Sequence, residues 1–163
     1  MNAFLRSSAL ILTIALAACA RDGGSGGQQT AGLEVMRTHL GQPIARGQIA
    51  VEASDAADAT SPEFPTYAAA VRQQLTRLGW TVLPNQGQGE QVALVDVSDA
   101  GGATRLEVGL KRRSEGSVFW QGQATSQPGT YGSAAGRVAA VQTLAEAVFR
   151  DFPGDSGRTI RLR

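Results

Sequence analysis

The N-terminal end of the chain is a short apolar segment that ends in a cysteine. Met1 to Arg6 carries one positive side-chain charge, residues 9–16 are apolar apart from one threonine, and small residues lead to Cys19. This order of regions is typical of a secretory signal peptide, which the mature protein lacks. The apolar run is shorter than the roughly 20 residues of a membrane-spanning helix. We therefore expect residues 1–18 to be removed and the fold to form from the remainder.

Residues 16–19, Leu-Ala-Ala-Cys, resemble the lipobox of bacterial lipoproteins. The resemblance implies cleavage before Cys19, a diacylglycerol group on its sulfur and acylation of the new N-terminus. Several acyl chains anchor a protein stably, because each buried CH₂ contributes about 0.8 kcal/mol. Ala20 stands where an aspartate retains lipoproteins in the inner membrane, so the resemblance implies an outer-membrane anchor that faces the periplasm. An ordinary signal peptide with a coincidental cysteine is the alternative interpretation.

The composition after cleavage limits the fold and the partners. Cys19 is the sole cysteine, so no disulfide is available and a hydrophobic core must hold the domain. Removing residues 1–18 from 163 leaves 145, which suits one domain and a tether. Fourteen basic residues then balance 14 acidic ones, and without a basic excess nucleic acid is not an expected partner. Residues 19–33, rich in glycine and glutamine, read as a lipidated cysteine and flexible tether, and residues 34–163 as a single α+β domain.

Two segments predict amphipathic helices. Apolar residues recur at helical spacing from Phe64 to Leu78, after a capping sequence at residues 61–63 and before Gly79. Residues 134–152 repeat the pattern and stop at a Pro-Gly pair. The polar stretch at residues 54–61 is expected to be a loop.

Strand patterns surround these helices. The expected strands are residues 34–40, 48–52, 80–83, 91–97, 105–113, 118–122 and 158–163, the last at an edge. Apolar and polar side chains alternate well over residues 105–113, and Val118 and Trp120 are expected on one face of the returning strand. This arrangement predicts an α+β two-layer sandwich: a mainly antiparallel sheet of about five to seven strands, with both helices on one face.

The search for reactive groups yields few candidates. Zinc needs clusters of histidine and cysteine, whereas His39 stands alone and Cys19 is assigned to lipid. Asp55, Asp58 and Glu63 lack the glycine and ligand spacing of a calcium loop, so a solvated loop is favoured. A serine hydrolase would have to use His39 as its base, but no G-x-S-x-G motif accompanies it. We predict no catalytic residue, no cofactor and no metal, with His39 as a polar residue at a strand end.

Asp96 is the acid of greatest interest. It shares strand parity with Val92 and Leu94, so it is expected to approach a buried face. A buried carboxylate must be paired or protonated. A salt bridge to an arginine such as Arg105 is the structural interpretation, and an acidic residue of an envelope hydrolase is the functional one.

Arg112 and Arg113 form a basic cluster with Lys111 at the end of the expected hairpin strand. The simplest interpretation is an exposed strand end, since charged side chains are common there. Contact with anionic headgroups or lipopolysaccharide is the functional alternative.

Several segments resemble a family of bacterial lipoproteins, the domain-of-unknown-function 4136 family. The similar segments are residues 64–71, 75–80, 91–97, 112–122 and 149–160, within a region from Thr38 to Ile160. The resemblance implies a lipobox, an envelope location and a compact α+β domain, and it transfers no catalytic residue. Some relatives carry a long glycine-rich insertion where this chain has only residues 99–102.

The sequence thus predicts an outer-membrane-anchored periplasmic lipoprotein that acts as a non-catalytic binding or assembly module. Its expected partners are the membrane, through Cys19, and a protein of the envelope; the oligomeric state is left open. An envelope hydrolase with acidic residues and an accessory protein that handles lipid or lipopolysaccharide are the alternatives.

Overall fold

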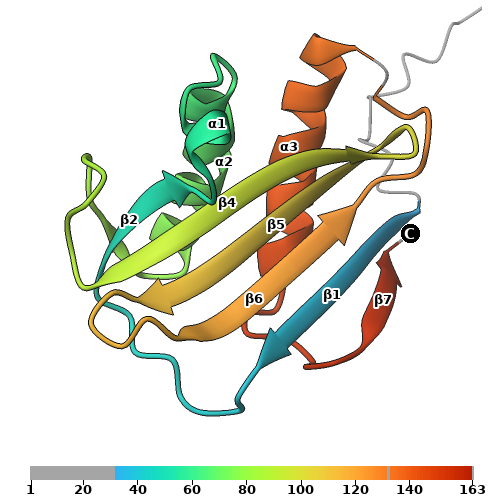
Figure 1. Ribbon diagram of the computed structural model, residues 1–163. Coiled ribbons are helices and arrows are strands. Elements are labelled where there is room, and N and C mark those ends of the chain that lie inside the picture. The colour runs from blue at the N-terminus through green and yellow to red at the C-terminus, as the bar shows by residue number, and fades with distance from the viewer. Residues whose placement is uncertain (1–31, 132, 163) are drawn as a thin grey trace, which may run out of the picture.

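The computed structural model describes residues 32–131 and 133–162 (Figure 1). The expected signal peptide, Cys19 and the expected tether up to residue 31 lie outside this part of the chain. The described elements are β1 (Leu33–His39), β2 (Gln48–Ala53), α1 (Ala56–Ala59), α2 (Phe64–Arg77), β3 (Thr81–Val82), β4 (Gln91–Ala100), β5 (Ala103–Arg112), β6 (Val118–Thr125), α3 (Ala134–Phe149) and β7 (Thr159–Leu162).

The strands form one seven-stranded mixed sheet in the order β3-β2-β4-β5-β6-β1-β7. β2 pairs in parallel with β3 and β4, and the remaining pairs are antiparallel. The α+β class and the mainly antiparallel sheet are therefore confirmed. β7 lies at an edge, as predicted, and β4 lies inside the sheet between β2 and β5.

The first predicted helix is confirmed as α2. Its apolar residues at helical spacing are buried: Phe64, Tyr67, Ala68, Val71 and Leu75. Gly79 ends the helix in a left-handed conformation with φ of +94°, which glycine adopts without steric cost. The Trp80 N–H then donates to the Leu75 oxygen at 3.0 Å and satisfies a carbonyl of the last turn.

One hydrophobic core cluster contains buried residues of the strands and of the two long helices, α2 and α3. Leu106, Val108 and Leu110 of β5 are fully buried, as their alternation predicts. α2 contacts β2, β3, β4 and α3, and α3 contacts β1, β5 and β6. Figure 1 shows both helices behind the strands. The opposite side of the sheet carries side chains such as Met36, which is 41% exposed.

The polar stretch at residues 54–61 is not wholly a loop, because it contains the short helix α1. Asp55 caps this helix and accepts a hydrogen bond from the Asp58 N–H at 2.8 Å. Aspartate is a strong N-cap because its carboxylate satisfies an unpaired amide of the first turn. The prediction failed because the segment has no apolar periodicity, and none of the residues of α1 is buried.

The expected shared face of Val118 and Trp120 is also wrong. The β5–β6 register shifts between Leu110 and Lys111, so that Trp120 pairs with Leu110 and Val118 pairs with Lys111. Trp120 is fully buried, whereas Val118 is 47% exposed. A β-bulge inserts one residue and moves the following side chains to the other face.

Arg37 is a buried charge that the sequence patterns did not reveal. It follows Val35 on the core side of β1 and is 4% exposed. Its Nε donates to the Val148 oxygen and its Nη2 to the Ala147 oxygen, each at 2.8 Å. These carbonyls belong to the last turn of α3, where a cation is favoured. The helix ends at Phe149, three residues before its predicted end, where Arg150 leaves the helical conformation with ψ of 134°.

Candidate functional site

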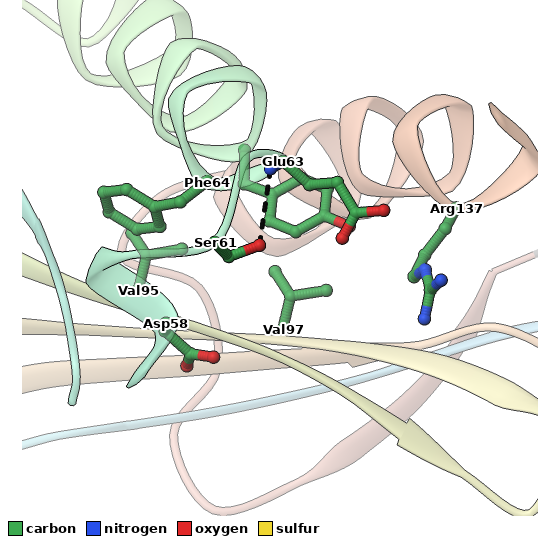
Figure 2. A pocket seen from close by; sticks show the side chains of 8 residues that line it. Asp58, Ser61, Glu63, Phe64, Val95, Val97 and Arg137 are labelled. Atoms are coloured by element: carbon green, nitrogen blue, oxygen red, sulfur yellow. Dashed lines mark hydrogen bonds between the residues drawn. The ribbon is translucent and has the colours of Figure 1, made fainter. Parts of the chain in front are cut away.

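A cavity of about 100 Å³ lies where the start of α2 meets β4 and the first turn of α3 (Figure 2). We call it the α2 pocket. Its walls come from segments that are distant in the sequence. The lining residues are Asp58, Ser61, Glu63, Phe64, Tyr67, Val95, Val97 and Arg137.

Local sequence explains how these side chains meet. Phe64 and Tyr67 are three residues apart on a helix, so both face the sheet. Val95 and Val97 are two residues apart on a strand and share its core side. The Ser61 hydroxyl accepts a hydrogen bond from the Glu63 N–H at 3.3 Å and shapes the turn into α2 (Figure 2). The pocket therefore has apolar walls and a polar rim.

The rim has an excess of negative charge. Burial, and then the charges of Asp55 and Asp96, raise the pKa of Asp58. Burial, and then Glu63, raise the pKa of the Tyr67 hydroxyl, which lies 3.5 Å from a carboxylate oxygen of Glu63. A group that binds here would thus meet acids that already repel one another.

Arg137 is the cation that lines the α2 pocket, and it is already paired. Its Nη1 donates to Oδ2 of Asp99 at 2.8 Å. Figure 2 shows its guanidinium at the opposite end of the pocket from Asp58. The arginine therefore balances Asp99 rather than Asp58 or Glu63.

Asp96 lies on the side of β4 that faces away from the core. The fully buried positions are Ala93 and Val95, so Asp96 has the opposite parity and is only half-buried. It stands opposite Glu107 on β5, whereas Arg105 stands opposite Ser98. The expected salt bridge to Arg105 is not among the ion pairs of the described residues.

His39 lies at the end of β1, where sequence reasoning placed it. Its Nε2 is 2.9 Å from the Gly154 oxygen, and its Nδ1 accepts a hydrogen bond from the Gly41 N–H at 3.1 Å. Because Nδ1 accepts, Nε2 carries the proton and donates to the carbonyl. His39 thus ties the end of β1 to the segment that follows α3.

Arg112 and Arg113 do not form one free basic patch. Arg112 Nη1 lies 3.2 Å from Oε2 of Glu115, and its guanidinium lies 5.3 Å from the ring centre of Phe119. The Arg113 guanidinium donates hydrogen bonds to the Glu52 carboxylate and to the Gly89 oxygen. Burial opposes ionisation of Glu52, but the hydrogen bonds from Arg113 and Gly87 lower its pKa overall. Both arginines therefore have acidic partners.

The pocket joins residues that sequence reasoning weighed separately or missed. Asp58 and Glu63 were considered only as metal ligands, and the described residues include no group of three or more histidine, cysteine or acidic side chains that could hold a metal. Tyr67 and Arg137 carried no signal beyond their helix patterns. The available clue was the alternation of Val95 and Val97, which marks the inward side of β4.

No protein-family model matches the sequence, and no curated protein matches it. One similar solved structure is a PelC dodecamer from Paraburkholderia phytofirmans, with 14% identity and a TM-score of 0.48 over 71% of this chain and 94% of that chain. Another is a PDZ domain protein from Parabacteroides distasonis, with 10% identity and a TM-score of 0.49 over 83% of this chain and 40% of that chain. These similarities are too distant to assign a function.

The helices in the described part of the chain are at most 16 residues long. None of those helices is both long enough and apolar enough to cross a bilayer.

Proposed function

We propose that this protein is a lipid-anchored, non-catalytic binding module of the bacterial envelope, held at the periplasmic face of the outer membrane. The observation that carries the proposal is the Leu-Ala-Ala-Cys sequence at residues 16–19, placed directly after an apolar run and followed by Ala20. The resemblance of segments between Thr38 and Ile160 to the domain-of-unknown-function 4136 lipoproteins implies the same location.

We also propose that the folded part is a two-layer sandwich with α2 and α3 on one face of the sheet. Support comes from the single core cluster that the strands share with both helices. In this arrangement the other face of the sheet is available to a partner. A protein that presents one sheet face and is tied to a membrane is suited to holding a partner close to that membrane.

The tether determines how far the domain reaches from its anchor. Residues 20–32 form a 13-residue segment in which glycine, serine and glutamine are frequent. A flexible chain of this length has a root-mean-square span of about 20 Å. The domain would therefore stay close to the bilayer and still turn to meet a partner.

The α2 pocket supports a role in binding, rather than a role as a spacer alone. Ligand sites combine apolar walls with a few polar groups that fix orientation. Phe64, Val95 and Val97 supply such walls, and Asp58 and Glu63 supply the polar groups. Its volume of about 100 Å³ suits one side chain of a partner rather than a large molecule.

Replacement of the acylated residue tests the anchoring. The variant Cys19→Ser should incorporate no labelled palmitate and should move from the membrane pellet to the soluble periplasmic fraction, because a hydroxyl cannot form the thioether. Ser25→Ala, in the tether, is the matched control and should remain in the pellet. Membrane fractionation that is the same for Cys19→Ser and the natural chain would refute the anchor.

A further inference from the structure

β4 is longer than its neighbour β2 at one end. β2 pairs with β4 only as far as Val95 and ends at Ala53, whereas β4 continues to Ala100. The chain then leaves the sheet into α1, and its last bond to β4 is from the Ser54 N–H to the Val95 oxygen at 2.9 Å. In the described part of the chain no strand pairs with β4 beyond this point on that side (Figure 1).

The orientation of the peptide groups in β4 shows which N–H and C=O groups have no neighbouring strand beyond the end of β2. Along a strand, alternate residues direct their N–H and C=O groups to opposite edges. The Val95 oxygen points toward β2, so Val97 and Asp99 direct their backbone groups to the unoccupied edge. An unpaired strand edge is a template for another strand. We call this segment, Val97–Asp99, the β4 edge.

The β4 edge borders the α2 pocket. The Val97 side chain lines the pocket and is half-buried, while Asp99 is exposed. A strand added here would run past the pocket mouth, and one of its side chains would point inward. Side chains alternate along a strand, so one inward residue would determine specificity.

The charges beside the β4 edge select the partner. Asp58 and Glu63 line the pocket, and Asp55 and Asp96 lie near enough to Asp58 to shift its titration. Among ion pairs of the described residues, none involves these four acids. An incoming cation would relieve the repulsion of Asp58 by Asp55 and Asp96, whereas an acidic segment would increase it. Charge complementarity therefore favours a basic segment.

We propose that the β4 edge binds an extended segment of a partner protein by strand addition, and that the α2 pocket receives a lysine or arginine side chain of this segment. The inference deepens the proposed binding function and rests on it. Backbone hydrogen bonds supply affinity in this mode, and the pocket supplies specificity. The pocket walls enclose the apolar stem of the side chain, and Asp58 and Glu63 accept from its charged end.

The test measures binding of a defined peptide to the full chain in detergent micelles. The probe is a fluorescein-labelled hexapeptide, Thr-Val-Lys-Val-Thr-Val, and the readout is fluorescence anisotropy. We expect saturable binding that weakens at least about tenfold when glutamate replaces the lysine, a loss equal to about 1.4 kcal/mol. The double variant Asp58→Asn with Glu63→Gln should show a similar loss. Asp155→Asn changes an exposed acid away from the pocket, with 66% of its side chain accessible, and should bind normally.

Two arms test the backbone contribution. Val97→Pro removes an N–H that faces outward, and proline is tolerated at such edge positions, so the variant should fold and bind at least about tenfold more weakly. A circular dichroism melt checks its folding. A hexapeptide N-methylated at alternate residues tests the same hydrogen bonds on the unaltered protein and should bind equally poorly.

Three results would overturn the inference. These are the absence of binding, equal affinity for the lysine and glutamate peptides, and binding that survives both Val97→Pro and N-methylation. Self-association that Val97→Pro abolishes in sedimentation would assign the edge to a second copy instead. Any of these results, with Cys19-dependent membrane fractionation intact, would remove the β4 edge as the binding surface and leave the anchoring standing.

Discussion

Asp58 shows how one carboxyl can work against the stability of its own fold. Burial, Asp55 and Asp96 raise its pKa above the ordinary 3.8. A carboxyl whose pKa is higher in the folded state than in the unfolded state binds its proton more tightly when the protein is folded. Its ionisation therefore lowers the free energy of unfolding as pH rises through the folded-state pKa. The proposed binding surface would retain such a cost, because an arriving cation would relieve the repulsion.

The variant Asp58→Asn should therefore stabilise the protein at neutral pH. We expect the free energy of unfolding at about pH 7 to rise by up to about 0.5 kcal/mol, and the difference to vanish near pH 3, where both states are protonated. Urea unfolding at the two pH values measures this. A variant that is less stable than the natural chain at pH 7 would show that Asp58 makes a favourable structural contact instead.

Arg37 illustrates the opposite case, in which a buried charge completes the fold. Its guanidinium donates to the Val148 carbonyl and to the Ala147 carbonyl, which among the described residues otherwise accepts only a long 3.4 Å hydrogen bond from the Arg150 N–H. Burial lowers its pKa while the nearby Asp151 opposes this, and arginine stays charged throughout. The sequence does not distinguish Arg37 from an ordinary polar residue, because its hydrogen-bond acceptors lie about 110 residues further along the chain.

At the scale of elements, Gly122 in β6 and Gly109 in β5 differ in the space that is available for a side chain. A Cβ at Gly122 would lie 2.4 Å from the Trp120 ring, whereas a Cβ at Gly109 would meet its nearest atom at 4.0 Å. Trp120 has no room to retreat, because it stacks on Phe149 with ring centres 5.3 Å apart and donates to the Pro153 oxygen at 3.0 Å. The glycine in β6 is therefore required by the tryptophan.

Gly122→Ala should destabilise the protein by about 1–3 kcal/mol, the usual cost of overpacking. Gly109→Ala is the matched control and should leave the free energy of unfolding unchanged or slightly higher, since alanine restricts the unfolded chain. Urea unfolding of both variants gives the comparison. Equal effects of the two substitutions would contradict the steric explanation.

Most elements could be predicted from sequence because their periodicity is local. The stripe from Phe64 to Leu78 and the alternation in β5 each identify an element and its buried side. The register shift between Val118 and Trp120 could not be found this way, because a bulge is a relation between two strands. The parity of Asp96 was ambiguous because Val92 and Ala93 are both buried, so each side of β4 looks apolar in that stretch.

The α2 pocket was beyond prediction for a further reason. It joins Asp58 of α1, Val97 of β4 and Arg137 of α3, and only the tertiary fold brings these three elements together. The anchor at Cys19 needs no such assembly, because its signal is contiguous in the sequence. It stays a prediction, since it lies outside the described residues.

At the scale of the whole molecule, the last strand protects the first. β7 pairs with β1 and covers what would otherwise be a sheet edge. Deletion of residues 158–163 should lower the free energy of unfolding by about 2 kcal/mol, because Ile160 and Leu162 bury apolar surface. It should also promote concentration-dependent association through the exposed edge of β1. Urea unfolding and sedimentation measure the two effects, and an unaltered monomer of normal stability would contradict this role.

The same topology has a mechanical consequence. The tether enters the fold at Leu33, and β1 pairs with β6 on one side and β7 on the other. A pull on the N-terminal segment along β1 therefore loads two hydrogen-bonded ladders in shear, and their bonds must yield together. A tether joined to an edge strand could instead unzip one ladder bond by bond. If the proposed anchor restrains the N-terminal end, the strand order makes β1 the strand that bears the force.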